Sequence, residues 1–187
     1  MGRFAGTEHG RRWQAARGIL RALLAAYLDA DPRALRFELG PHGKPALAQQ
    51  SGDSPTALRF NLSHAGGTAL YAVAAGREVG VDLEREGRRF NAVAVARRIF
   101  GAEEAERLAA LDPASRDREF LRRWVRHEAV VKCAGTGIGA AMEETDRPQP
   151  EPWVAEVDVG PGAFAAVAGT GNRCELRCWQ WPARAAT

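Results

Sequence analysis

The chain has 187 residues, 45% of them apolar and 26% charged, with a net charge of +3 at pH 7. No apolar run approaches the about 18 residues of a membrane-spanning helix, and the opening MGRFAGTEHGRR lacks the apolar core of a secretory signal. We therefore expect a cytoplasmic protein of one domain or two small lobes, without membrane association. The mild basic excess favours an anionic ligand or an acidic partner and is too weak to indicate nucleic acid.

The first half of the chain predicts a helix followed by short strands. Apolar residues recur every three or four positions over residues 11–28, which is typical of an amphipathic helix. Residues 35–39 alternate as a short strand, and GPHGKP and QQSGDSPT then form loops. The segments LRFNLSH, GGTALYAVAAG and EVGVDLE follow as strands, and we expect the third to be the hairpin partner of the second.

The second half predicts helices and then strands. NAVAVARRIF and AEEAERLAAL indicate two helices separated by Gly101, and Asp112-Pro113 indicates the start of a longer helix over about 115–133. Three strands are expected in the tail, at 153–159, 163–168 and 174–181. Residues 67–76 resemble residues 162–171, which suggests two similar α+β lobes.

The cysteines do not predict a disulfide framework. Cys133, Cys174 and Cys178 form no CxxC pair, and their number is odd. Cys174 and Cys178 would share a face of the last predicted strand, and we expect structural thiols.

Two carboxylates stand on one face of the strand in REVGVDLERE. Because apolar residues alternate with the others there, Asp82 and Glu84 point the same way, about 7 Å apart. Like charges this close repel each other unless water screens them or a cation lies between them. Two interpretations remain: a solvated strand edge, or a site for a hard cation such as Mg²⁺, which prefers oxygen ligands.

The long helix carries a further acid and base. Trp124, Glu128 and Lys132 are spaced four residues apart and so lie along one helix face. A surface ion pair worth about 0.3–0.5 kcal/mol is one interpretation, but Glu128 and Lys132 border an apolar stripe of the helix. Glu128 is the best candidate for a third carboxylate at a cation, and Lys132 could then meet a phosphate held there.

Phosphate-binding groups gather after the strand LRFNLSH. Ser63 and His64 precede Ala-Gly-Gly, so a hydroxyl, an imidazole and loop amides lie together. A structural hydrogen bond of the lone histidine is the alternative. Lys44 lies between Gly43 and Pro45, where the backbone is restricted, and is either functional or a solvated lysine.

Five motifs occur in order along the chain: GKP (43–45), FNLSHAGG (60–67), VGVDLE (79–84), RRIFGAEE (97–104) and WVRHEAVVKCAGTGI (124–138). In this order and spacing the chain resembles the 4′-phosphopantetheinyl transferases of the Sfp type. The resemblance implies an α+β fold, a pseudo-twofold pair of lobes at 1–85 and 86–187, with the active site in the cleft between them.

The resemblance also implies an activity. These enzymes transfer the phosphopantetheine arm of coenzyme A to a serine of an acyl or peptidyl carrier protein and release adenosine 3′,5′-bisphosphate. The cofactor is Mg²⁺, with Mn²⁺ possible, and the chain is expected to be a monomer. Positioning and charge neutralisation supply most of the rate in such phosphoryl transfers.

The resemblance assigns roles at the reacting phosphate. It implies Asp82, Glu84 and Glu128 as Mg²⁺ ligands, and Lys132 as the cation beside the leaving oxygen. Glu104 falls where some members have a glutamate proposed as general base for the serine hydroxyl. Glu128 or a metal-bound water is the alternative base.

The resemblance assigns four further residues to coenzyme A. It implies Ser63 and His64 on the side of the 3′-phosphate, Lys44 near the same nucleotide, and Arg12 on a phosphate. The chain departs from the family pattern at His127, where lysine is usual, so that the charge there depends on pH. It also begins closer to its RF motif than relatives do, as a compact member or through a late start.

Two functions from other classes remain open. A catalytically silent protein of the same fold would bind coenzyme A or a carrier without turnover, although the intact Asp82, Glu84, Glu128 and Lys132 speak against it. A basic RNA- or DNA-binding domain is less favoured, because no aromatic stacking platform or recognised motif is present.

Overall fold

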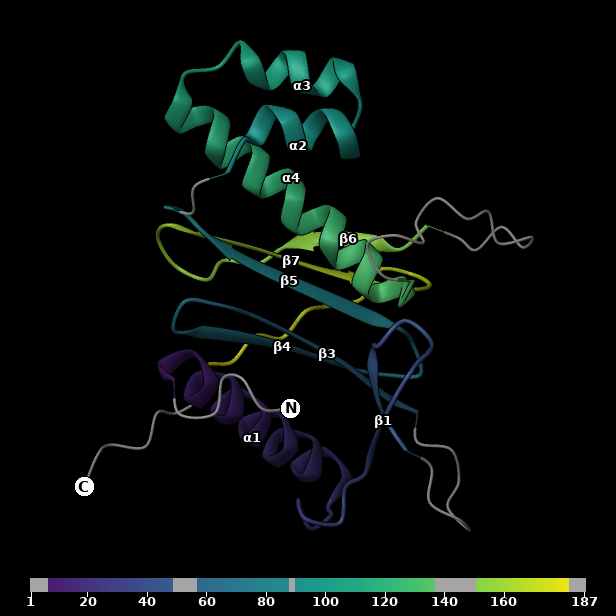
Figure 1. Ribbon diagram of the computed structural model, residues 1–187. Helices are drawn as coiled ribbons and strands as arrows, with labels where there is room; N and C mark the ends of the chain where they lie inside the picture. Colours follow the sequence, from purple (N-terminus) through teal and green to yellow (C-terminus); the bar gives the residue numbers. More distant parts are fainter. Residues whose placement is uncertain (1–6, 49–56, 88–89, 137–150, 182–187) are drawn as a thin grey trace.

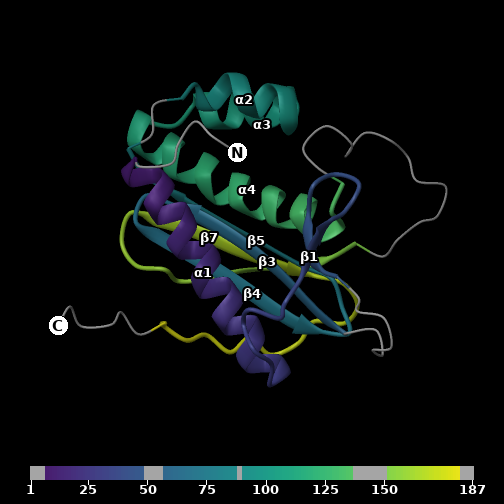
Figure 2. The same ribbon diagram turned by 60° about the horizontal axis from the view of Figure 1, so that its bottom comes forward.

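The computed structural model describes residues 7–48, 57–87, 90–136 and 151–181. Its elements form successive layers, which Figures 1 and 2 show from two sides. Helix α1 (Glu8–Leu28) covers strands β3 (Leu58–Ala65) and β4 (Thr68–Ala75). Beyond them lie β5 (Val79–Arg85), β7 (Ala163–Gly169) and β6 (Trp153–Glu156), which α4 (Pro113–Ala134) covers. The predicted α+β class is confirmed.

Helix α1 is defined by its caps and its apolar face. The Thr7 side chain accepts a hydrogen bond from Gly10 N and so starts the helix three residues before the predicted position. Asp29 ends it in the left-handed conformation, with φ 48°. Leu20 and Leu24 are buried against Phe60 of β3, which forms the core of the first lobe.

The strands of the first lobe form two antiparallel hairpins. Strands β1 (Phe37–Leu39) and β2 (Pro45–Leu47) pair with each other, and β3 pairs with β4 through the turn at Gly66-Gly67. The prediction that EVGVDLE is the hairpin partner of β4 is therefore wrong. The two-glycine turn favours the β3–β4 hairpin, since Gly66 adopts φ 59° without a steric penalty.

Strand β5 instead forms a sheet with strands from the C-terminal half of the chain. It pairs antiparallel with β7, which also pairs with β6, so that Asp82 lies opposite Ala166. Residues 79–83 of β5 are all buried, as expected of a strand covered on both faces. The division at residue 85 would give β5 to the first lobe and stays a prediction.

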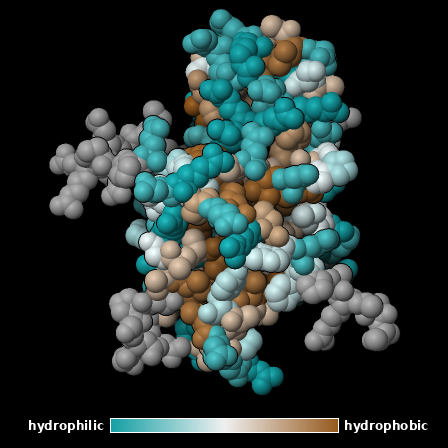
Figure 3. Space-filling model, turned by 180° about the vertical axis from the view of Figure 1, so that it is seen from behind, coloured by the Kyte–Doolittle hydropathy of each residue, from teal (hydrophilic) through white to brown (hydrophobic). Residues whose placement is uncertain are grey.

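The predicted strand at 174–181 is wrong. In the described part of the chain this segment is exposed and outside the sheets, although its apolar residues alternate. Trp179 is 76% exposed, and Cys174 and Cys178 are exposed too, whereas Cys133 is buried. The face seen in Figure 3 carries hydrophobic surface at the level of the strands.

The helices of the second half follow their predicted order. Helices α2 (Ala92–Ile99) and α3 (Ala102–Ala109) are separated at Gly101, which has φ 96°. Asp112 caps α4 by accepting hydrogen bonds from the amides of residues 114 and 115, and Gly135 ends it with φ 70°. None of the helices described is long and apolar enough to cross a membrane.

Helix α4 lies directly on strand β5 because small residues meet there. A Cβ placed on Gly80 would lie 2.1 Å from Ala129 O and 2.2 Å from Cys133 N. No side chain fits in that space, so the two backbones are in contact at this point. Ala129 and Cys133 are also buried against Ala166 of β7. This close approach brings the polar face of α4 beside Asp82.

Candidate active site

Asp82 belongs to a polar network built from β3, β5 and α4. It is 4% exposed. Ser63 Oγ donates to Asp82 Oδ1 at 3.0 Å, and Lys132 Nζ donates to the same oxygen at 2.5 Å and to Ser63 Oγ at 3.3 Å. The structure thus brings together three predicted site residues from three elements. The second carboxylate oxygen, Asp82 Oδ2, is buried without a hydrogen-bond partner.

Glu128 lies one turn before Lys132 on α4 and is 6% exposed. Its Oε1 is also buried without a hydrogen-bond partner. Burial raises the pKa of Glu128, and the charges of Asp82 and Glu84 raise it too, whereas the charge of Lys132 lowers it. Glu128 is therefore close enough to both carboxylates of β5 for their charges to raise its pKa.

These two carboxylates fit a hard cation. A buried carboxylate oxygen without a partner is unfavourable, and a bound cation would satisfy it. In the described ranges no three His, Cys, Asp or Glu side chains converge as a metal cluster. A cation bound by Asp82 and Glu128 would take further ligands from water or a phosphate. That Glu84, which is half-buried, joins this ligand set stays a prediction.

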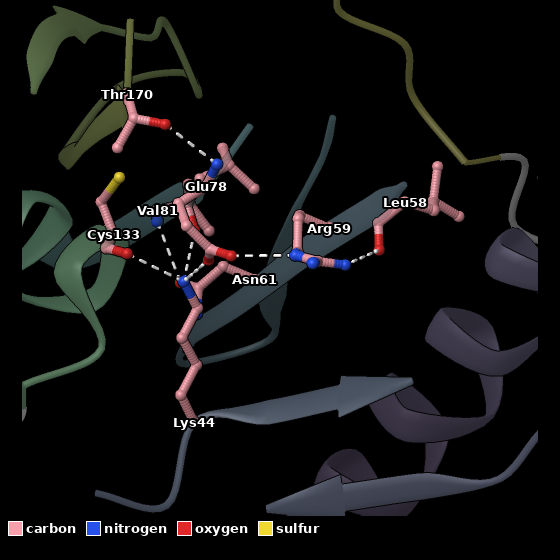
Figure 4. A network of polar contacts seen from close by, with 9 residues as sticks. Lys44, Leu58, Arg59, Asn61, Glu78, Val81, Cys133 and Thr170 are labelled. Atoms are coloured by element: carbon pink, nitrogen blue, oxygen red, sulfur yellow. Dashed lines mark hydrogen bonds and ion pairs between the residues drawn. The ribbon is translucent and has the colours of Figure 1, made fainter. Parts of the chain in front are cut away.

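Lys44 lies in a separate network at the start of β5 (Figure 4). Its Nζ donates to Glu78 Oε2 at 2.7 Å, to Cys133 O at 2.9 Å and to Val79 O at 3.2 Å. Arg59 Nε donates to the other oxygen of Glu78 at 2.9 Å. In this arrangement Lys44 joins the β1–β2 hairpin to α4 and β5, and its predicted contact with coenzyme A stays a prediction.

The other residues predicted to bind coenzyme A lie on the first lobe. His64 follows Ser63 on β3 and is exposed, so it points to the opposite side of the strand from the buried Ser63. Arg12 is on the exposed side of α1 and forms an ion pair with Glu8. Both assignments stay predictions.

Glu104 is held by arginines on the far side of α4. It is 8% exposed, accepts from Arg107 at 2.7 and 3.1 Å, and lies 3.4 Å from Arg123 of α4. The hydrogen bond from Arg107 lowers the pKa of Glu104, and the charge of Arg123 lowers it too. Arg123 and Lys132 are separated by about two and a half helical turns, so they lie on opposite faces of α4. The assignment of Glu104 as general base stays a prediction.

His127 packs among aromatic rings. Its ring centroid lies 5.5 Å from that of Phe100, edge to face, and 6.2 Å from that of Trp124. Burial lowers the pKa of His127, so the imidazole is neutral at pH 7. The position thus lacks the permanent positive charge that the family pattern predicts there.

Two residues of the site were missed by the sequence reasoning. Gly80 permits the contact between α4 and β5, and a glycine inside a buried strand was the available signal. Asn61 is 7% exposed, and its Oδ1 accepts from Val81 N at 2.9 Å. A polar residue at an inward position of a strand was the signal for Asn61.

Comparison with known proteins gives a consistent picture. A family model described as "4'-phosphopantetheinyl transferase superfamily" matches residues 78–178, and one described as "4'-phosphopantetheinyl transferase, N-terminal" matches residues 1–78. The 4'-phosphopantetheinyl transferase HetI of Nostoc sp. is 39% identical over 77% of this chain and 60% of its own length. The 4'-phosphopantetheinyl transferase AcpT of Escherichia coli O157:H7 is 36% identical over 66% and 57%.

A human relative is more distant. L-aminoadipate-semialdehyde dehydrogenase-phosphopantetheinyl transferase is 26% identical over 78% of this chain and 49% of its own length. The chain thus spans about half to three-fifths of the length of these relatives. The superfamily model covers more than half of the chain, including Asp82, Glu128 and Lys132. The chain therefore belongs to the 4'-phosphopantetheinyl transferase superfamily.

Proposed function

We propose that this protein transfers the 4′-phosphopantetheine group of coenzyme A to a serine of an acyl or peptidyl carrier protein. The serine oxygen forms a bond to the β-phosphorus of coenzyme A, and the bond from that phosphorus to the bridging oxygen breaks. Adenosine 3′,5′-bisphosphate leaves with the electron pair. The observation that carries the proposal is the pair of buried, unpartnered oxygens, Asp82 Oδ2 and Glu128 Oε1, beside the ammonium group of Lys132.

Asp82 and Glu128 would hold a divalent cation, with Glu84 as a third ligand. When bound, Mg²⁺ or Mn²⁺ neutralises the charge of the diphosphate and favours departure of the bridging oxygen. Asp82 keeps one oxygen on Lys132 and leaves the other without a partner, so it can serve both groups. A site of this kind holds two negative charges ready for a cation, and a phosphate would bind through that cation and Lys132.

Lys132 supplies positive charge at the edge of the buried network. Its side chain is 30% exposed, so the ammonium group lies between the interior and solvent. An incoming diphosphate can therefore replace Asp82 or Ser63 as the acceptor for one of the three N–H donors of Lys132. Positive charge at that place stabilises the leaving oxygen.

The residues for the rest of coenzyme A come from the first lobe. His64 and Arg12 are exposed and suit its phosphates. Lys44 and Ser63 already form hydrogen bonds within the protein, so a phosphate contact by either would exchange an existing bond. Both oxygens of Glu104 contact arginines, which makes this carboxylate a poor acceptor for the serine proton. With Oε1 of Glu128 assigned to the cation, the other oxygen of Glu128 would accept that proton.

A carrier-labelling assay tests this function. Fluorescent coenzyme A is mixed with the protein and an apo peptidyl carrier domain, with Mg²⁺ or with chelator, and labelled carrier is measured. We expect labelling with Mg²⁺, and a loss with chelator or with a carrier whose acceptor serine is alanine. Coenzyme A binding without labelling of either an acyl or a peptidyl carrier would contradict the transferase and support a silent binding protein. The monomeric state and the cytoplasmic location stay predictions.

A further inference from the structure

Side chains of Lys44, Asn61 and Ser63 form hydrogen bonds with the edge of strand β5 that does not pair with β7. On one edge β5 pairs with β7. On the other edge three alternate residues use backbone groups: Val79 O accepts from Lys44, and the amides of Val81 and Leu83 donate to Asn61 Oδ1 and Ser63 Oγ, at 2.9 and 3.2 Å. Alternate residues of a strand direct these groups to the same edge.

The arrangement replaces a strand-to-strand ladder. Asn61 and Ser63 are two residues apart on β3, and their partners Val81 and Leu83 are two residues apart on β5 in the same direction. The two strands therefore run side by side and parallel, while β3 pairs through its own backbone with β4. The oxygens that β5 meets belong to side chains, so two substitutions can remove them without changing the backbone.

We call the contact of Asn61 and Ser63 with Val81 and Leu83 the β3–β5 seam. The Ser63 hydroxyl uses all of its hydrogen-bonding positions there. A serine hydroxyl has one donor and two acceptor positions. Here it donates to Asp82 Oδ1 at 3.0 Å and accepts from Leu83 N at 3.2 Å and Lys132 Nζ at 3.3 Å. These bonds hold Asp82 Oδ1, and Oδ2 is left buried and unpartnered.

We propose that Asn61 and Ser63 are positioning residues, which hold β5 against the first lobe and orient Asp82 so that Oδ2 remains available to a divalent cation. Asn61 sets the register of β5 at Val81, and Ser63 fixes both Leu83 and the carboxylate between Val81 and Leu83. The cation part of this inference rests on the proposed function, whereas the strand part rests only on hydrogen bonds.

Amide hydrogen exchange of the full chain tests the strand part. In Ser63→Ala we expect the Leu83 amide to exchange roughly five- to tenfold faster, because its acceptor is lost, with a smaller change at Val81. Asn61→Ala should show the reverse pattern, and Asn61→Asp, which keeps the acceptor, should keep Val81 protected. Ser115→Ala on the exposed start of α4 makes the same chemical change elsewhere and should alter neither amide.

Binding of Mn²⁺, measured by electron paramagnetic resonance without coenzyme A or carrier, tests the cation part. Ser63→Ala should weaken Mn²⁺ binding about tenfold, as loss of an outer hydrogen bond to a ligand does. Ser63→Thr restores the hydroxyl and should restore both Mn²⁺ affinity and protection of Leu83. If Ser63→Ala does not fold, Ser63→Cys is used instead, because its thiol is a weak donor. Its Mn²⁺ affinity and Leu83 exchange rate should lie between those of the wild type and those expected for Ser63→Ala.

The proposed role of Ser63 in the β3–β5 seam would be overturned by unchanged amide exchange at Leu83 in a folded Ser63→Ala protein. Failure of Ser63→Thr to restore protection of the Leu83 amide would overturn it too. Unchanged Mn²⁺ affinity in Ser63→Ala, or no Mn²⁺ binding by the wild type, would overturn the orientation of Asp82 toward a cation. Neither readout uses the transfer reaction. A wild-type protein that binds Mn²⁺ and shows the expected exchange but labels no carrier would therefore contradict the proposed function alone.

Discussion

Two buried glutamates lie at α4 in opposite electrostatic settings. Glu104 contacts two arginines, and the pKa of its carboxyl is lowered, first by the hydrogen bond from Arg107. Glu128 lies near Asp82 and Glu84, has an oxygen without a hydrogen-bond partner, and has a pKa raised chiefly by burial. The two are almost equally buried, at 8% and 6% exposure, so burial does not distinguish them.

The difference teaches what the partners of a buried acid indicate. Both oxygens of Glu104 contact Arg107 of the same helix, and one of them also contacts Arg123 of α4, which is a structural task. Glu128 lies near the negative charges of Asp82 and Glu84, and the positive charge of Lys132 offsets part of this excess. A buried carboxylate left in such an excess is typical of a binding site for cations.

The largest effect is expected from the acids near Lys132. Asp82→Asn and Glu128→Gln should each lower carrier labelling about 10²- to 10³-fold, because the charge that binds the cation is lost. Stability in urea should be unchanged or higher in Glu128→Gln, since a buried charge with an unpartnered oxygen is removed, whereas Asp82→Asn also loses the ion pair with Lys132 and should be less stable. The matched control is Glu104→Gln. Equal loss of labelling in this control with unchanged stability would break the comparison and identify Glu104 as the base.

A second substitution separates α4 from β5. Gly80→Ala would place a Cβ about 2.1 Å from Ala129 O, where only backbone could move. We expect the free energy of unfolding to fall by about 3 kcal/mol, measured by urea denaturation. Gly18→Ala in α1 has no atom within 4 Å of the added Cβ and should instead stabilise by about 0.5–1 kcal/mol. A Gly80→Ala protein as stable as wild type would contradict this contact.

The smallest effect concerns Glu104 and depends on pH. Because its folded pKa is lowered, its contribution to stability is present above the ordinary glutamate range and is lost as pH falls through the folded pKa. Glu104→Gln should therefore cost about 1–2 kcal/mol near pH 7, a modest value because its arginines are half exposed. Urea midpoints of both proteins should converge on acidification. A constant difference at every pH would show that the ion pairs do not cause the effect.

The sequence by itself determined most of the local elements and indicated the candidate site residues. The helix start at Asp112 depends on a side chain that bonds amides two and three residues away, and the period of two in β5 places Asp82 and Glu84 on one face. Both effects involve neighbours in the chain, so the pattern of residues is sufficient to predict them. The order of the five motifs was sufficient to indicate the family.

Only the tertiary structure decided how the elements pair. The partner of β5 is β7, about 80 residues away, and the segment at 174–181 alternates like a strand but joins no described sheet. Pairing depends on which edges are free and how closely layers approach, as at Gly80 and along the side chains of Asn61 and Ser63. The same holds for the two glutamates: both were candidate acids in the sequence, and the arginines or carboxylates that packing brings beside them separate their roles.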